Sequence, residues 1–268
     1  MKWGGSLVDE LGGVDDTRVA VAGDWHSNIM WIQQVLPALR RFAPDVSTIL
    51  HTGDFSILPE ARGKKLLRAA DAACRENGID RILVTPGNHE DWPRLDTLFA
   101  ARPGEAIRLS ASVWVMPRGY RFSIHGRTFM SFGGATSLDA AYRRTRGTWW
   151  ASEMPTSEEA AAAVVAGGVD VLVTHETIMD STARVEARIR ANPTHWDETA
   201  LAYSLQSRAL ITRLWREAKP AILAHGHIHV ADQRMLPSGQ RIYALANDGQ
   251  RKNIAVIDIA SLTWTWID

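Results

Sequence analysis

The segment Arg18–His26, RVAVAGDWH, passes from a short apolar run into a glycine, an aspartate and a histidine. Its first part, 18–22, has the length and composition of a buried β-strand. An amphipathic helix is predicted soon after it, at 29–42, with Ser27 or Asn28 near its cap. The polar turn therefore lies between a predicted strand and a predicted helix.

The same order of strand and helix continues through the first third of the chain. A second strand is predicted at 48–51, followed by a helix from about Pro59 to Asn77 that ends at Gly78. A third strand is predicted at 82–85. Strands that alternate with helices predict a parallel sheet with right-handed crossover connections.

The rest of the chain mixes short strand patterns with longer helical ones. Turn residues separate four strand-like runs that predict antiparallel strands, at 107–109, 113–116, 121–124 and 128–132. Helices are predicted at 157–166 and 199–218, and strands at 169–174, 221–224, 240–245, 253–259 and 262–267. The sequence has no internal repeat and no linker. We therefore expect one α/β domain, residues 1–268, built on a core of two sheets.

The composition is typical of a globular protein. Hydrophobic residues make up 46% of the 268 residues and charged residues 22%. The formal net charge is zero, so no global electric field attracts nucleic acid or an anionic membrane to this chain. A local basic patch remains compatible with this balance.

The amino-terminal residues MKWGGSLVDELGG lack the apolar core of a signal peptide, and no apolar run reaches membrane-spanning length. The single cysteine, Cys74, allows no internal disulfide and is predicted to lie on the buried face of a helix. These features predict a cytoplasmic protein without a membrane partner. They leave its oligomeric state open.

Five predicted strand ends are followed by Asp, Asn or His side chains. The segments are Gly23-Asp24-Trp25-His26, Gly53-Asp54, Gly87-Asn88-His89-Glu90, His175, and Gly226-His227-Ile228-His229. Ligands of α/β sheets gather at the carboxyl ends of the strands. The first three segments are each about thirty residues apart, which is the length of a β-α-β unit and places them side by side.

Imidazole, carboxylate and amide groups without thiolate suit Mn, Fe, Zn, Co or Ni. Seven such groups are candidates: Asp24, His26, Asp54, Asn88, His175, His227 and His229. They are too many for one tetrahedral zinc ion and enough for two metals that share a carboxylate. Two divalent metals can hold a hydroxide and clamp the entering and leaving oxygens of a displacement at phosphorus. His89, next to Asn88, is then placed to donate a proton to the leaving oxygen as general acid.

The ordered set GDxH, GD, GNHE, H and GHxH resembles the calcineurin-like metallophosphoesterase family. The motifs span residues 24–229, which is most of the chain. The resemblance implies an αββα sandwich, in which two mixed β-sheets are flanked by helices. It also implies a binuclear metal-dependent phosphoric ester hydrolase.

The resemblance assigns the ligands motif by motif. One metal would be bound by Asp24, His26, Asp54 and His229. The other would be bound by Asp54, Asn88, His175 and His227. Asp54 would bridge the two metals, and His89 matches the proton-donating histidine of the family. Manganese is the metal we expect first, with Fe, Zn, Co or Ni as alternatives.

Two departures argue against a Ser/Thr protein phosphatase. That branch carries GDxxDRG at the second motif, whereas residues 53–59 read GDFSILP and lack the Asp-Arg pair. It also carries glycine after the histidine of the first motif, where this chain has Ser27.

The substrate stays open at this stage. A small phosphodiester or a nucleotide is the first expectation, and a phosphomonoester comes close behind. A nuclease acting on DNA or RNA is an alternative, and a non-catalytic interaction module on the same fold is another. The segment Ala141–Trp150, AYRRTRGTWW, offers Arg143, Arg144 and Arg146 as phosphate contacts, or else forms a solvated basic turn with packed tryptophans.

Several neighbours of the motifs have two interpretations. His51 and His225 either support a metal ligand or are ordinary buried histidines. Glu90 is expected to support the site or begin a helix rather than bind metal. Trp25 is expected to form a wall of the site, and His125 and His195 are expected at the surface or in turns.

Overall fold

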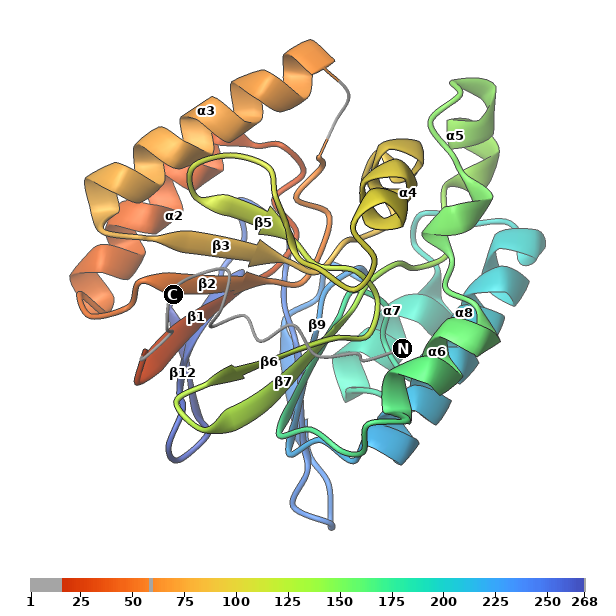
Figure 1. Cartoon of the computed structure of the whole chain (residues 1–268). Coiled ribbons are helices and arrows are strands. Elements are labelled where there is room, and N and C mark those ends of the chain that lie inside the picture. Colours follow the sequence, from red (N-terminus) through yellow and green to blue (C-terminus); the bar gives the residue numbers. More distant parts are fainter. Residues whose placement is uncertain (1–15, 58–59, 268) are drawn as a thin grey trace.

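Two β-sheets lie face to face at the centre of the molecule, and helices cover the outer face of each sheet (Figure 1). The computed structural model describes residues 16–57 and 60–267. The predicted α/β sandwich of two mixed sheets flanked by helices is confirmed. The predictions that rest on residues 1–13, and the helix start at Pro59, lie outside the described residues.

The first sheet has a parallel centre with antiparallel edges. Within the described residues its strand order is β13-β12-β1-β2-β3-β5-β4. The parallel strands are β1 (Arg18–Ala22), β2 (Thr48–His51), β3 (Arg81–Val84) and β5 (Val113–Val115). The antiparallel additions are β12 (Ile254–Asp258), β13 (Thr263–Ile267) and β4 (Ile107–Arg108). The parallel sheet predicted from the first third is thus confirmed.

The second sheet repeats this plan in the order β10-β11-β9-β8-β7-β6. Its parallel strands are β7 (Arg127–Phe132), β8 (Val171–Thr174), β9 (Ile222–His225) and β11 (Arg241–Ala244). The antiparallel strands β6 (Tyr120–Ile124) and β10 (Asp232–Met235) flank them. The antiparallel strands predicted for 107–132 form two pairs, β4 with β5 and β6 with β7, one in each sheet. The remaining partners of β5 and β7 are parallel, which the sequence pattern did not indicate.

The side chains of the central strands alternate between two hydrophobic layers. In β1, Val19 and Val21 face the other sheet, whereas Ala20 and Ala22 pack beneath the helices. Strand β8 divides in the same way, with Val171 in the layer between the sheets and Leu172 in the outer layer. Because both faces of each central strand are buried, these strands read as continuous apolar runs in the sequence.

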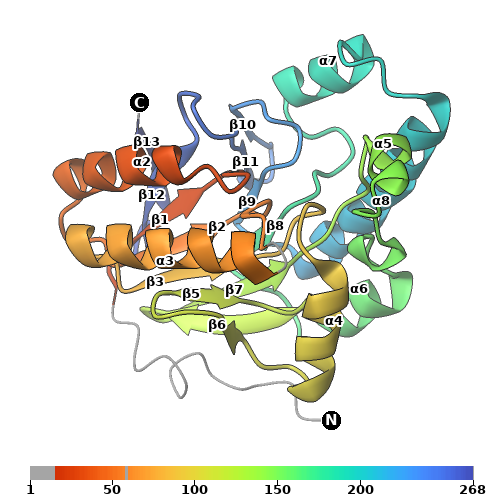
Figure 2. The same ribbon diagram turned by 90° about the horizontal axis from the view of Figure 1, so that it is seen from above.

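Helices α2 (Ile29–Phe42) and α3 (Glu60–Asn77) lie over the first sheet, and α6 (Ser157–Val164) and α8 (Glu198–Ala218) lie over the second (Figure 2). Asn28 is the cap of α2, because its side-chain oxygen accepts a hydrogen bond from the Trp31 N–H at 3.0 Å. Cys74 is fully buried in α3, as predicted.

Some short elements were not predicted from the sequence. They are α4 (Trp92–Ala101), α5 (Ala140–Thr145), η1 (Ala151–Glu153), α7 (Ala183–Ala191) and β10. Helix α7 buries only Val185 fully, and the alternation of apolar and charged residues in its sequence, ARVEARIRA, does not indicate a helix. None of the helices in the described part of the chain combines the length and apolar character that crossing a bilayer requires.

Leu50 tests the layer between the sheets, because its side chain is fully buried there. We expect Leu50→Ala to lower the free energy of unfolding by about 3 kcal/mol, through lost burial and the cavity that remains. Urea unfolding of the purified proteins measures this change. Leu205→Ala on α8, where the side chain is 52% exposed, is the control and should cost less than about 0.5 kcal/mol. Equal losses in the two variants would contradict the packing described.

Candidate metal centre

The residues predicted as metal ligands lie in the loops that follow five parallel strands. Asp24 and His26 follow β1, Asp54 follows β2, Asn88 follows β3, His175 follows β8, and His227 and His229 follow β9. The two sheets therefore contribute their carboxyl ends to one location. Parallel pairing within each sheet brings these loops together.

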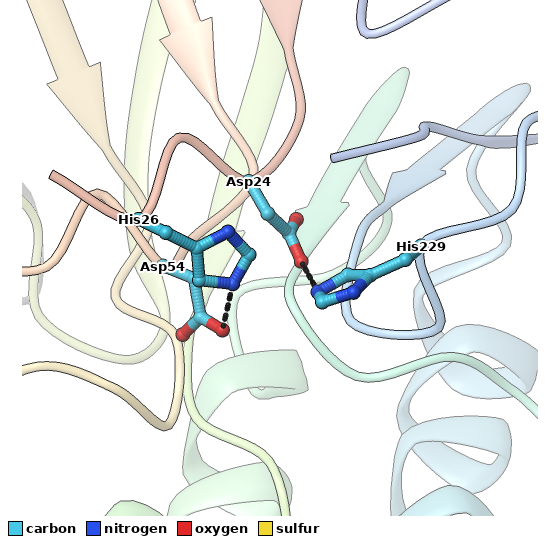
Figure 3. A group of neighbouring side chains, drawn as sticks. All are labelled: Asp24, His26, Asp54 and His229. Atoms are coloured by element: carbon cyan, nitrogen blue, oxygen red, sulfur yellow. Dashed lines mark ion pairs between the residues drawn. The ribbon is translucent and has the colours of Figure 1, made fainter. Parts of the chain in front are cut away.

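Four of these side chains form a compact group, Asp24, His26, Asp54 and His229, that is shown in Figure 3. One potential ligand atom from each lies within 4.8 Å of the others. Asp24 Oδ2 is 3.1 Å from His229 Nε2, and Asp54 Oδ2 is 3.5 Å from His26 Nε2. Two carboxylates and two imidazoles converging in this way form a suitable donor set for a divalent transition metal.

The other candidate ligands form a second group beside the first. His175 Nε2 is 2.9 Å from Asn88 Oδ1 and 3.4 Å from Asp54 Oδ1. The ring of His227 lies 4.9 Å from that of His175, measured between centroids. Asp54 belongs to both groups, because one of its oxygens faces His26 and the other faces His175.

The hydrogen bonding of this second group fits a bound cation. His175 Nδ1 is 2.8 Å from the Thr52 carbonyl oxygen, so Nδ1 carries a hydrogen. In the neutral ring, the lone pair of Nε2 then faces the oxygens of Asn88 and Asp54, which are acceptors as well. The buried Nε2 of His227 has no hydrogen-bond partner among the described residues. The facing acceptors of His175, Asn88 and Asp54 are satisfied by a proton or by a metal ion.

The charges of the ligand side chains are strongly coupled. Burial alone would raise the pKa of Asp24, but His175 and His229 lower it to about 2. Burial likewise opposes ionisation of Asp54, whose pKa the neighbouring histidines His175 and His89 hold well below its ordinary value. Burial would lower the pKa of His26, yet the carboxylates of Asp54 and Asp24 raise it to about 10. The carboxylates therefore stay ionised and attract positive charge into the site.

The backbone at the site is held in an unusual conformation. His26, Asp54, His227 and His229 all have positive φ angles, of 44°, 53°, 69° and 57°. Such a conformation costs a non-glycine residue on the order of 1–3 kcal/mol. Strain that gathers on candidate ligands indicates a functional site that the surrounding fold holds in place.

The glycines of the motifs allow close approach. A side chain on Gly87 would overlap the Asp54 carboxylate, and one on Gly226 would overlap the Asp24 carboxylate. Glycine is therefore required at these two positions by the carboxylates that lie against them.

A family model described as calcineurin-like phosphoesterase matches residues 17–231. The chain belongs to the calcineurin-like phosphoesterase family. The resemblance found in the motifs is thereby confirmed. Membership of this family supports a hydrolase that acts on phosphoesters with divalent metals, for which the Asp and His group is a possible site.

Solved structures share this fold. One is the protein TT1561 of Thermus thermophilus, at 10% sequence identity and a TM-score of 0.52, with 92% of this chain and 96% of that chain covered. Another is a dimetal phosphatase from Danio rerio, at 11% identity and a TM-score of 0.52, with 89% and 91% covered. At these identities the likeness shows the fold alone. The chain has no match among curated proteins.

Glu90 of this phosphoesterase holds two of the site loops together through hydrogen bonds to their backbone. Its buried carboxylate accepts hydrogen bonds from the backbone N–H groups of Ile57, Phe55 and Gly87, at 2.7, 3.1 and 3.2 Å. These contacts connect the loop that carries Asp54 with the loop that carries Asn88. Glu90 thus has the supporting position expected from the sequence.

Asp248 is a site residue that the motifs did not reveal. Its Oδ1 is 3.1 Å from His26 Nδ1, and its Oδ2 accepts a hydrogen bond from the Asn28 side chain at 2.7 Å. A carboxylate on Nδ1 orients the imidazole so that Nε2 faces the centre. Its position just after the strand predicted at 240–245 was the available signal, since the other site residues also follow strand ends.

The three arginines of the 141–150 segment have different surroundings. Arg143 is buried and bonded to Glu153, to Ser137 and to the Asn88 carbonyl oxygen, so it supports the Asn88 loop. The exposed guanidinium of Arg144 lies 4.0 Å above the Trp149 ring. That of Arg146 lies 4.5 Å above Tyr142.

Other neighbours lie beneath or away from the centre. Trp25, expected as a wall of the site, is fully buried and donates its indole N–H to Asn253 at 2.9 Å, so it packs under the site. His51 and His225 are also fully buried, and burial lowers their pKa values to about 3 and about 4. His125 and His195 are exposed, as predicted.

His89 lines a cavity of about 720 Å³ that opens beside the centre. Its backbone N–H donates to Asp54 Oδ1 at 2.9 Å, and its ring lies 5.9 Å from that of His26. The apolar part of the cavity is formed by Ile29, Leu66, Tyr142 and Trp150.

Asp248 offers a test of ligand orientation. We expect Asp248→Ala to weaken Mn²⁺ binding about tenfold, because His26 loses the carboxylate that orients its ring. Calorimetric titration of metal-stripped protein with Mn²⁺ measures the Kd. Asp80→Ala removes a carboxylate that is 67% exposed and should leave the Kd as it was. An unaltered Kd in the Asp248 variant would show that His26 needs no such support.

Proposed function

We propose that this protein is a phosphoesterase with two divalent metals, which hydrolyses a small phosphodiester or a nucleotide. The observation that carries the proposal is the position of Asp54, whose two oxygens face His26 and His175 at 3.5 and 3.4 Å. A carboxylate placed between two groups of donors is suited to bridge two metals. The proposed ligands are Asp24, His26, Asp54 and His229 for one metal, and Asp54, Asn88, His175 and His227 for the other.

The chemistry divides between the metals and the side chains. When bound, divalent metals would activate water and stabilise the negative charge of the phosphoryl group. His89 is proposed to donate a proton to the leaving oxygen. Burial lowers the pKa of His89 despite the opposing charge of Asp54, and a lower pKa makes its imidazolium a stronger acid. The Asn88 amide is held by Ser137 at 2.9 Å and thereby keeps its oxygen toward the centre.

The cavity beside His89 supports a substrate with an organic leaving group. Its walls combine the aromatic rings of Tyr142 and Trp150 with basic side chains and with carboxylates, namely Arg62, Lys65, Asp91 and Asp139. A nucleoside or another ring-bearing alcohol fits these walls, with the ester oxygen next to His89. A phosphomonoester is the second candidate, because the same cavity accepts its alcohol.

We also propose that residues 1–268 act as one domain and that manganese is the metal to test first.

Metal dependence tests the proposed centre directly. We expect metal-stripped protein to hydrolyse 4-nitrophenyl phosphate and bis(4-nitrophenyl) phosphate only after Mn²⁺ is added. Asp54→Asn should reduce turnover of both esters at least about 10³-fold, because it weakens both metal sites at once. Release of 4-nitrophenol measures the rates. Normal turnover by Asp54→Asn would refute the proposal, and the better ester would indicate the substrate class.

His89 is tested by the choice of leaving group. We expect His89→Asn to lower kcat about 10²-fold for a phenyl ester, whose leaving oxygen needs a proton. The loss should be smaller for a 4-nitrophenyl ester, which departs readily without one. Rates for both esters at saturating Mn²⁺ measure the difference, and His125→Asn in an exposed turn is the control. Equal losses for the two esters would exclude His89 as the proton donor.

A further inference from the structure

A second cavity, of about 710 Å³, shares no lining residue with the cavity that His89 lines. It is formed by helix α7, by the end of the loop after β9 and by the loop after β11. His229 lines the cavity, and its side chain is 38% exposed. Because His229 Nε2 is 3.1 Å from Asp24 Oδ2, the cavity opens onto the proposed metal centre.

The lining of this cavity is strongly basic. Arg184, Arg188, Arg251 and Lys252 all contribute to it, and no carboxylate is among the described residues that line it. The chain as a whole has a formal net charge of zero, so four cations around one cavity are a local concentration. Asp248, in the same loop as Arg251 and Lys252, is bonded instead to His26 and Asn28.

Two of the arginines come from successive turns of α7 and lie on the same face of the helix. Arg184 is anchored, because its Nη1 donates to the Ala231 carbonyl oxygen at 3.0 Å. Arg188 has a buried Nε with no hydrogen-bond partner in the described part of the chain. Two neighbouring guanidinium groups that both line the cavity are suited to hold the oxygens of a phosphate group.

We propose that this basic cavity binds a second phosphate group of the substrate. The inference rests on the proposed function: the ester to be hydrolysed lies at the metal centre, its leaving alcohol lies beside His89, and the second phosphate lies among Arg184, Arg188 and Lys252. The substrate class is then a small phosphoester that carries a further phosphate, such as a nucleoside bisphosphate derivative. Bond breaking remains at the metal centre, and the cavity contributes binding and selectivity.

A matched pair of esters tests this inference. Thymidine 5′-(4-nitrophenyl phosphate) and its 3′-phosphorylated counterpart release the same 4-nitrophenol and differ by one phosphate group. We expect the 3′-phosphorylated ester to have a kcat/KM at least about tenfold higher, as charged hydrogen bonds of this kind contribute. In the double variant Arg184→Gln/Arg188→Gln, the ratio of the two values should fall close to one.

The control is Arg190→Gln, which removes a charge from the same helix at a residue outside the cavity and should keep the ratio. Lys252→Gln is an independent variant that should lower the ratio even if the double variant folds poorly. Binding of thymidine 3′,5′-bisphosphate to metal-stripped protein is measured by calorimetry. Its affinity should fall about tenfold in the double variant.

The outcomes separate the two proposals. Metal-dependent turnover with equal kcat/KM for the two esters contradicts phosphate binding by the basic cavity. It leaves the proposed phosphoesterase activity supported. Arginine-dependent binding of the bisphosphate without turnover of either ester supports phosphate binding by the basic cavity and contradicts the proposed phosphoesterase function. Arginine-dependent cleavage of a single-stranded oligothymidylate, with no preference between the small esters, overturns the small-molecule class in favour of nucleic acid.

Discussion

The contacts of Asp54 are the constraint on which the site depends. Its carboxylate accepts the His89 N–H and faces His26 and His175, while its carbonyl oxygen accepts the N–H groups of Trp25 and His26. One residue at the end of β2 thereby connects the loops after β1, β3 and β8. Its positive φ makes these contacts possible at a cost in backbone strain.

That strain is balanced by the rigid layers beneath the loops. The central strands are buried on both faces, and Glu90 joins two of the site loops through three backbone N–H groups. Ligand side chains are consequently held in place before any metal binds, which avoids the cost of ordering them. The mutual repulsion of two buried carboxylates, Asp24 and Asp54, is the complementary cost, and a cation relieves it.

Two cavities of similar size and different character border the centre. The one beside His89 has aromatic and apolar walls with both basic and acidic side chains around them, whereas the one beside His229 is lined by arginines and lysine with no carboxylate among its described lining residues. Such an arrangement suits a substrate with an organic part at one end and an anionic part at the other. The loop after β11 serves both the metal centre and the basic cavity, because Asp248 orients His26 while Arg251 and Lys252 line the cavity.

The sequence by itself determined the β-α-β order, the family and the candidate ligands, because buried strands and the motifs after them are local patterns. It did not reveal α7, in whose sequence apolar and charged residues alternate, or the parallel partners of β5 and β7. Only the tertiary structure decided that Arg143 supports the Asn88 loop, that Trp25 packs beneath the site and that Asp248 holds His26. These contacts join residues that are far apart in the chain, and their geometry is set by how the two sheets pack, which no local pattern encodes.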